Sequence, residues 1–132
     1  HCSSAASDVY KRQHFNHFVE KGGRFGKRIV YGGHVISLTR SISFNGLSNA
    51  FKIIAINGGT HASPCFAGKT VFAWSKIIEK VDVSDTLGAL RIRTNGLGDA
   101  QPYQFQHQDQ NGKFNSDVLL SLDYWALVPK KI

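Results

Sequence analysis

The chain has 132 residues, 42% of them hydrophobic, which is enough for one domain with a core and too few for two ordinary domains. No run of 18 apolar residues is present, so we expect no membrane-spanning segment. Lys and Arg number 16 against 9 acidic residues, a net charge of +7. These basic residues are scattered, whereas nucleic-acid binders usually concentrate them on one face. A small polyanionic ligand suits the charge equally well, and charge alone does not decide.

Residues 1–13, HCSSAASDVYKRQ, are small and polar and lack apolar periodicity, unlike the sequence after them. We interpret this segment as a foreign leader, translated from adapter or vector sequence and joined to a truncated reading frame. A native disordered N-terminus is the alternative interpretation. Either interpretation confines the folded domain to residues 14–132.

Residues 34–47, HVISLTRSISFNGL, are predicted to form a long helix that follows the glycines at 32 and 33. Its apolar stripe has helical spacing and comprises Val35, Ile36, Leu38, Ile42 and Phe44. The Asn45–Gly46 pair is a typical C-terminal stop. The remaining positions are mostly Ser and Thr, which are mediocre helix formers and suit a helix that a sheet approaches closely.

Four strands are predicted to follow: 51–57, bounded by Gly58–Gly59; a strand from the 64–68 turn to about 83; 89–94; and 117–128. The last has one wholly apolar face with a period of two, as a strand against a core requires: Val118, Leu120, Leu122, Tyr124, Ala126 and Val128. A polar loop, residues 98–116, separates the last two strands. These elements predict a helix wrapped by a curved antiparallel sheet.

From about His14 almost to the end of the chain, the sequence resembles the MaoC-like (R)-specific enoyl-CoA hydratases. The blocks that carry the resemblance are GRFGKRIVYGGHVISLTRSISFNGLSNAF, IAINGGTHASPCFAGKTVFAWS, VSDTLGALRIRT and LDYWALVPKK. Within the family they are most similar to the C-terminal half of the mesaconyl-CoA hydratase (β-methylmalyl-CoA dehydratase) type. The resemblance implies an α+β hot-dog fold. The family's strand before the helix would lie upstream of His14, so we expect an N-terminally truncated domain with an unpaired sheet edge.

The resemblance also assigns candidate site residues. His14 matches the motif histidine that handles water and a proton, and Asn16 matches the acidic or amide position just after it. The 17 residues between His14 and the helix-start glycine, Gly32, match the family's spacing. Tyr31, Gly33 and His34 complete the predicted substrate-binding positions at the helix start. Two glycines that only make a tight turn are the alternative interpretation of this segment.

Two positions depart from the family pattern. Val9 stands where the motif has an aspartate, so the usual Asp–His pair is incomplete. Lys69 replaces an aspartate in the Pro-x-x-x-Gly-Asp-Thr turn, which affects local turn contacts but not the fold. His17 and His34 are weaker candidates for supporting roles, and His61 and His107 are predicted to lie in loops.

The resemblance implies a lyase that reversibly adds water to an α,β-unsaturated acyl-CoA, such as mesaconyl-CoA. Two alternatives stay open: a non-catalytic hot-dog half that shapes the pocket or binds coenzyme A, and a hot-dog thioesterase. We expect no metal or other cofactor, with coenzyme A entering as part of the substrate. The expected partner is a second hot-dog domain or another copy of the chain. Cys2 and Cys65 form no disulfide framework, and we interpret both as free thiols of a cytoplasmic protein.

Overall fold

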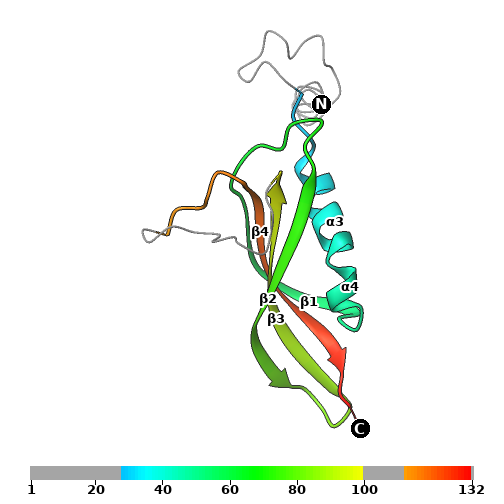
Figure 1. Ribbon diagram of the computed structural model, residues 1–132. Helices are drawn as coiled ribbons and strands as arrows, with labels where there is room; N and C mark the ends of the chain where they lie inside the picture. The colour runs from blue at the N-terminus through cyan, green and yellow to red at the C-terminus, as the bar shows by residue number, and fades with distance from the viewer. Residues whose placement is uncertain (1–27, 100–111, 132) are drawn as a thin grey trace, which may run out of the picture.

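The computed structural model describes residues 28–99 and 112–131, so the predicted leader, His14 and Asn16 lie outside the described residues. The chain forms helices α3 (Gly32–Ile42) and α4 (Phe44–Leu47) and strands β1 (Lys52–His61), β2 (Val71–Asp82), β3 (Leu87–Gly98) and β4 (Val118–Pro129). The strands make one antiparallel sheet in the order β1-β4-β3-β2. The helices lie along one face of this twisted sheet (Figure 1), and the predicted α+β hot-dog fold is confirmed.

The helical segment starts at Gly32 and ends at Leu47, with one interruption at Ser43. The Ser43 hydroxyl donates a 2.8 Å hydrogen bond to the Thr39 carbonyl, which also accepts a bond from the Ser43 backbone N–H. A side chain that bonds to the backbone in this way competes with regular helix geometry. The helical segment ends at Leu47, the last residue of the predicted helix. Asn45 and Gly46, the predicted stop, lie inside α4, and Leu47 is buried.

The buried face of the helix is narrower than predicted. Val35 and Thr39 are buried, whereas Ile42 and Phe44 are 41% and 59% exposed. Thr39 packs against β3, where a Cβ atom added to Gly96 would lie 2.6 Å from Thr39 Oγ1. A larger residue at either position would hold the helix away from the sheet. The expectation that small hydroxyl residues permit close approach of the sheet is confirmed at this contact.

The predicted apolar face of β4 forms the centre of the core. Its buried residues are Val118, Leu120, Leu122, Tyr124 and Ala126, while Val128 is partly buried. β4 lies between β1 and β3, and its inner face packs with apolar side chains of β3 and of the helical segment. Leu119 is buried as well, next to a register irregularity where Leu97 pairs with Val118.

Two strands are longer than predicted because pairing with β4 overrides the local glycine signals. β1 continues through Gly58–Gly59 to His61, with register shifts on either side of Ala55 and Ile56. β3 likewise continues through Gly96 to Gly98. The hydrogen bonds to β4 offset the intrinsic cost of glycine in a strand. The extension of β1 determines where His61 lies.

β1 and β2 are the two edges of the sheet that the described residues form. Every residue of β1 is exposed, including the apolar Ile53, Ile54 and Ile56. The predicted unpaired edge therefore has two candidates within the described part of the chain. No helix in that part is long and apolar enough to cross a membrane.

Candidate active site

The start of α3 presents its first backbone amides without a cap from the side chain of residue 31. Tyr31 occupies the N-cap position without a side-chain cap bond, and the first turn carries no acidic residue. The Tyr31 carbonyl accepts bonds from the N–H groups of His34 and Val35, at 3.0 and 3.2 Å. The N–H groups of Gly32 and Gly33 come earlier, where a helix provides no acceptor of its own. These two amides and the positive end of the helix dipole can stabilise a negative charge.

Short backbone contacts attach the segment before the helix to the connection between β1 and β2. The Val30 N–H donates a 2.7 Å bond to the Cys65 carbonyl, and the Ala67 N–H donates a 3.1 Å bond to the Arg28 carbonyl. Ile29 and Phe66 form an antiparallel bridge between these bonds. The helix start is therefore held at a fixed distance from residues 62–67.

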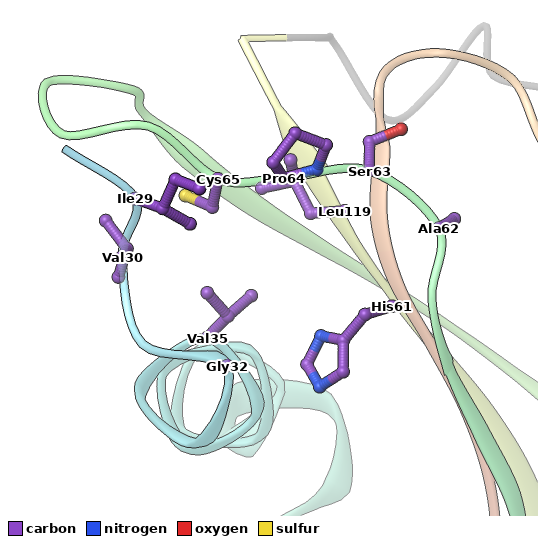
Figure 2. A pocket seen from close by; sticks show the side chains of 10 residues that line it. All are labelled: Ile29, Val30, Gly32, Val35, His61, Ala62, Ser63, Pro64, Cys65 and Leu119. Carbon is purple, nitrogen blue, oxygen red and sulfur yellow. The ribbon is translucent and has the colours of Figure 1, made fainter. Parts of the chain in front are cut away.

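A cleft of about 330 Å³ lies between the helix start and this connection. Figure 2 shows the side chains around it: Ile29, Val30, Gly32, Val35, His61, Ala62, Ser63, Pro64, Cys65 and Leu119. Three of these lining residues, Val35, Cys65 and Leu119, belong to a small buried core cluster that also contains Leu120. An apolar cleft with a few convergent polar groups is typical of a small-molecule site. Gly32 is the predicted site residue that lines it.

His61 lies directly against the helix start. A Cβ atom added to Gly32 would be 2.9 Å from His61 Cε1 and 3.0 Å from Nε2. In Figure 2 the imidazole extends from the end of β1 toward the first turn of α3. Glycine at position 32 therefore permits the imidazole to approach the backbone closely, a role that no other residue type fits without displacing the ring.

His61 was not predicted as a site residue, because position 61 was expected to lie in a loop. The pairing of β1 with β4 instead continues through Gly58 and Gly59, and His61 pairs with Leu120 at the end of the strand. This pairing carries the imidazole to the helix start. The available signal was the apolar and aromatic alternation of β4, which extends far enough to pair with a longer β1.

Cys65 is unsuited to nucleophilic chemistry despite its place in the cleft. The residue is a free cysteine and only 6% exposed. Burial raises the pKa of its thiol, and Asp99 raises it further, against an opposing effect of Lys69. The thiolate is the reactive form of cysteine, and these surroundings disfavour it. Cys65 thus serves as an apolar part of the cleft wall.

The other predicted helix-start residues lie around the cleft without lining it. Tyr31 is 49% exposed, and its ring covers Gly33, where an added Cβ would lie 2.5 Å from Tyr31 Cε1. His34 is exposed. The structure brings Gly32 and His61 together and leaves the roles of Tyr31, Gly33 and His34 as predictions. His14 and Asn16 lie outside the described residues, so the role of His14 next to Gly32 stays a prediction.

A charged network lies on the other face of the sheet. Asp123 accepts hydrogen bonds from Arg91 Nε and Nη2, at 3.0 and 2.9 Å, and from Arg93 and Asn57, at 3.3 and 3.0 Å. The Arg91 bonds are the main cause that lowers the pKa of Asp123 to about 2, with Asn57 and Arg93 adding to the effect and burial opposing it. Asp123 pairs with both arginines and accepts a bond from Asn57, so this network joins strands β1, β3 and β4.

Across residues 28–99 and 112–131, no group of three or more His, Cys, Asp or Glu side chains is arranged to hold a metal ion. The expectation that the protein needs no cofactor stays a prediction.

No protein-family model matches the chain. Two relatives are 50% identical to it: a β-methylmalyl-CoA dehydratase from Chloroflexus aurantiacus over 122 residues, and a mesaconyl-CoA hydratase from Cereibacter sphaeroides over 116 residues. The matches cover 91% and 86% of this chain and 35% and 33% of the relatives. The chain therefore spans about a third of the length of these proteins.

A solved structure of a MaoC domain protein dehydratase from Chloroflexus aurantiacus has the same fold. It matches with a TM-score of 0.85 and 50% identity, over 92% of this chain and 35% of its own. The predicted resemblance to the MaoC-like hydratases is confirmed, with mesaconyl-CoA hydratase and β-methylmalyl-CoA dehydratase among the relatives. The predicted location in their C-terminal half stays a prediction.

Proposed function

We propose that this chain is part of an acyl-CoA hydratase/dehydratase that reversibly adds water to mesaconyl-CoA, giving β-methylmalyl-CoA. The proposal is supported by 50% identity to two relatives that carry those names. The geometric observation that carries it is the uncapped start of α3, which opens on an apolar cleft at Gly32. A site of this kind suits the unsaturated thioester part of the acyl group, whose carbonyl oxygen gains negative charge during the reaction.

The chemistry explains why a helix start is useful. Water adds its hydroxyl group to the β-carbon and a proton reaches the α-carbon, so the thioester carbonyl acquires enolate character. The N–H groups of Gly32 and Gly33 would stabilise that oxygen, and loss of one such donor typically costs on the order of 100-fold in rate. The cleft walls would exclude bulk water, which strengthens the same electrostatic interaction.

Proton transfer is assigned to His14, with Asn16 beside it, on the strength of the family motif. A histidine is suited to this role because its unperturbed pKa, about 6.5, lies near neutral pH. Tyr31 and His34 are proposed to contact the substrate at the rim of the same helix start. We propose no metal or redox cofactor, since the addition of water requires only proton transfer and stabilisation of the oxygen.

The relatives are about three times as long as this chain, so the complete site is proposed to need a further part. A second hot-dog domain or another copy of the chain would supply it, next to the exposed sheet edges. We propose no nucleic-acid partner and no membrane attachment. The compartment proposed is the cytoplasm, which agrees with the free thiol of Cys65.

The test is an assay of the natural protein, with any sequence that flanks these residues, on mesaconyl-CoA. The proposal expects a product heavier by one water and the reverse reaction from β-methylmalyl-CoA. A His14→Ala variant should lose hydration while it still binds acyl-CoA. Unchanged hydration in that variant would favour the alternative of a non-catalytic half. Release of a free thiol without any hydrated product would indicate a thioesterase and overturn the proposal.

A further inference from the structure

We infer that His61 donates a hydrogen bond to the thioester carbonyl oxygen, and that it forms a two-donor site with the backbone amide of Gly32. This inference rests on the proposed function and adds a catalytic residue that the family motif does not include. It arises from the juxtaposition of two segments distant in sequence, the end of β1 and the start of α3.

The positions of the two donors support a shared acceptor. The imidazole lies so close to Gly32 that an added Cβ would be 3.0 Å from Nε2 and 2.9 Å from Cε1. The Gly32 amide is the first of the helix and has no acceptor within it. Both groups border the same cleft of about 330 Å³. We place the carbonyl oxygen in this cleft at the helix start, between the ring and the amide.

Among the described residues that line the cleft, His61 is the one with a strong side-chain donor. The Ser63 hydroxyl points away from the cleft in Figure 2, and the Cys65 thiol is directed at the Phe66 carbonyl, 3.9 Å away. The other lining side chains are apolar. An imidazole has at least one N–H group in either protonation state, so His61 can donate without a coupled proton transfer.

The fold holds His61 in position through its backbone. His61 pairs with Leu120, and the next residue, Ala62, donates a 3.1 Å bond to the Leu119 carbonyl. The ring thus extends from a strand end that is hydrogen-bonded on both sides of the residue. A donor attached to a paired strand keeps its geometry as charge develops on the oxygen, which is the requirement for electrostatic catalysis.

The test compares His61→Ala and His61→Gln in the natural protein, with any flanking sequence present. Thr60→Ala is the matched control, because Thr60 is the adjacent β1 residue and its side chain lines a separate hollow with Arg93 and Asp123. With mesaconyl-CoA as substrate, His61→Ala should lower kcat on the order of 100-fold and leave KM nearly unchanged. His61→Gln keeps an N–H donor and should recover part of the loss. Thr60→Ala should match the unaltered protein.

A second readout measures the contact without turnover. Butyryl-CoA labelled with ¹³C at the thioester carbonyl is saturated and cannot be hydrated, and its carbonyl band reports hydrogen bonding in difference infrared spectra. Binding to the unaltered protein should move the band to lower frequency. His61→Ala should remove part of that displacement, and His61→Gln should restore some of it. A histidine with a purely structural role would leave the band of the bound ligand unchanged.

The outcomes separate this inference from the proposed function. Normal hydration and an unchanged carbonyl band in His61→Ala would overturn the inference and leave the hydratase intact. An unaltered protein that hydrates no unsaturated acyl-CoA, but shows a carbonyl band that depends on His61, would overturn the proposed reaction and support the contact. Loss of hydration in His61→Ala with no change in the band would also overturn the inference.

Discussion

The two ends of the helical segment pack against the same sheet with opposite results. At the C-terminal end, buried apolar side chains fill the space between helix and sheet in one cluster: Leu47, Ala50, Ile92, Leu122, Tyr124 and Ala126. At the N-terminal end, the buried cluster is smaller and comprises Val35, Cys65, Leu119 and Leu120. A cleft with Gly32 and His61 opens beside it. The C-terminal end fixes the helix against the sheet. The N-terminal end leaves the backbone amides of its first turn beside the cleft.

The largest effect on stability should come from a substitution in the buried cluster at the C-terminal end of the helical segment. Ile92 is fully buried, so Ile92→Ala should lower the free energy of unfolding by about 3 kcal/mol through lost burial and a residual cavity. Urea denaturation measures this change. Val83→Ala is the control, because Val83 is 55% exposed and its truncation should stay within about 0.5 kcal/mol. Equal effects of the two substitutions would contradict the assignment of the core.

The next largest effect should come from a substitution at the cleft beside the start of α3. Gly32→Ala places a Cβ against His61 and should displace the imidazole, lowering the rate of hydration on the order of 100-fold. Gly46→Ala is the matched control, since a Cβ at this helical glycine meets nothing within 4 Å. It should leave hydration unchanged and stabilise the fold by up to about 1 kcal/mol.

A double substitution sharpens this result. If Gly32→Ala acts partly by moving the ring, it should cost less in a His61→Ala background than in the unaltered protein. Steady-state rates of the single and double variants give this coupling. Strictly additive losses would mean that the two residues act independently.

Between the two ends, Thr39 and Gly96 determine how closely the helix approaches the sheet. Gly96→Ala should lower the free energy of unfolding by about 2 kcal/mol, because its Cβ would lie 2.6 Å from Thr39 Oγ1. Thr39→Ala removes that oxygen, which has no hydrogen-bond partner in the described structure. Gly96→Ala should therefore be better tolerated in the Thr39→Ala background. Thermal unfolding of the four combinations tests this, and a loss unaffected by Thr39→Ala would contradict the contact.

The smallest effect concerns the network on the opposite face of the sheet. The pKa of Asp123 is lowered from 3.8 to about 2. Its pairing therefore stabilises the folded state fully at pH values above the pKa of the unfolded aspartate. That contribution should fade as the pH decreases from about 4 to 2. Its size is on the order of 1 kcal/mol, since the partner arginines are partly exposed. Asp123→Asn should remove this pH dependence of the unfolding midpoint, and a persistent dependence would point to other carboxylates.

The elements of the fold were predictable where periodicity was strong. The alternation from Val118 to Val128 gave β4 and most of its buried face, and the apolar spacing around Val35 gave the helix. The ends of β1 and β3 were not predictable from local signals. Glycine normally marks a strand end, yet Gly58 and Gly96 lie within strands because pairing with β4 outweighs their local preference.

The family resemblance assigned Gly32 to the site, and the structure shows that Gly32 lines the cleft at the start of α3. His61 could not be placed beside Gly32, since their proximity depends on the length of β1, and so on tertiary pairing. Ile42 and Phe44 fit a helical stripe but are exposed, because the close contact at Thr39 sets the helix rotation. The assignments to His14 and Asn16 stay predictions from the family motif.

The most direct measurement is a crystal structure of the natural protein with butyryl-CoA bound. The account predicts that the thioester oxygen lies about 3 Å from the Gly32 or Gly33 amide nitrogen and from a ring nitrogen of His61. A thioester that binds away from the start of α3, or an oxygen that contacts neither donor, would contradict it.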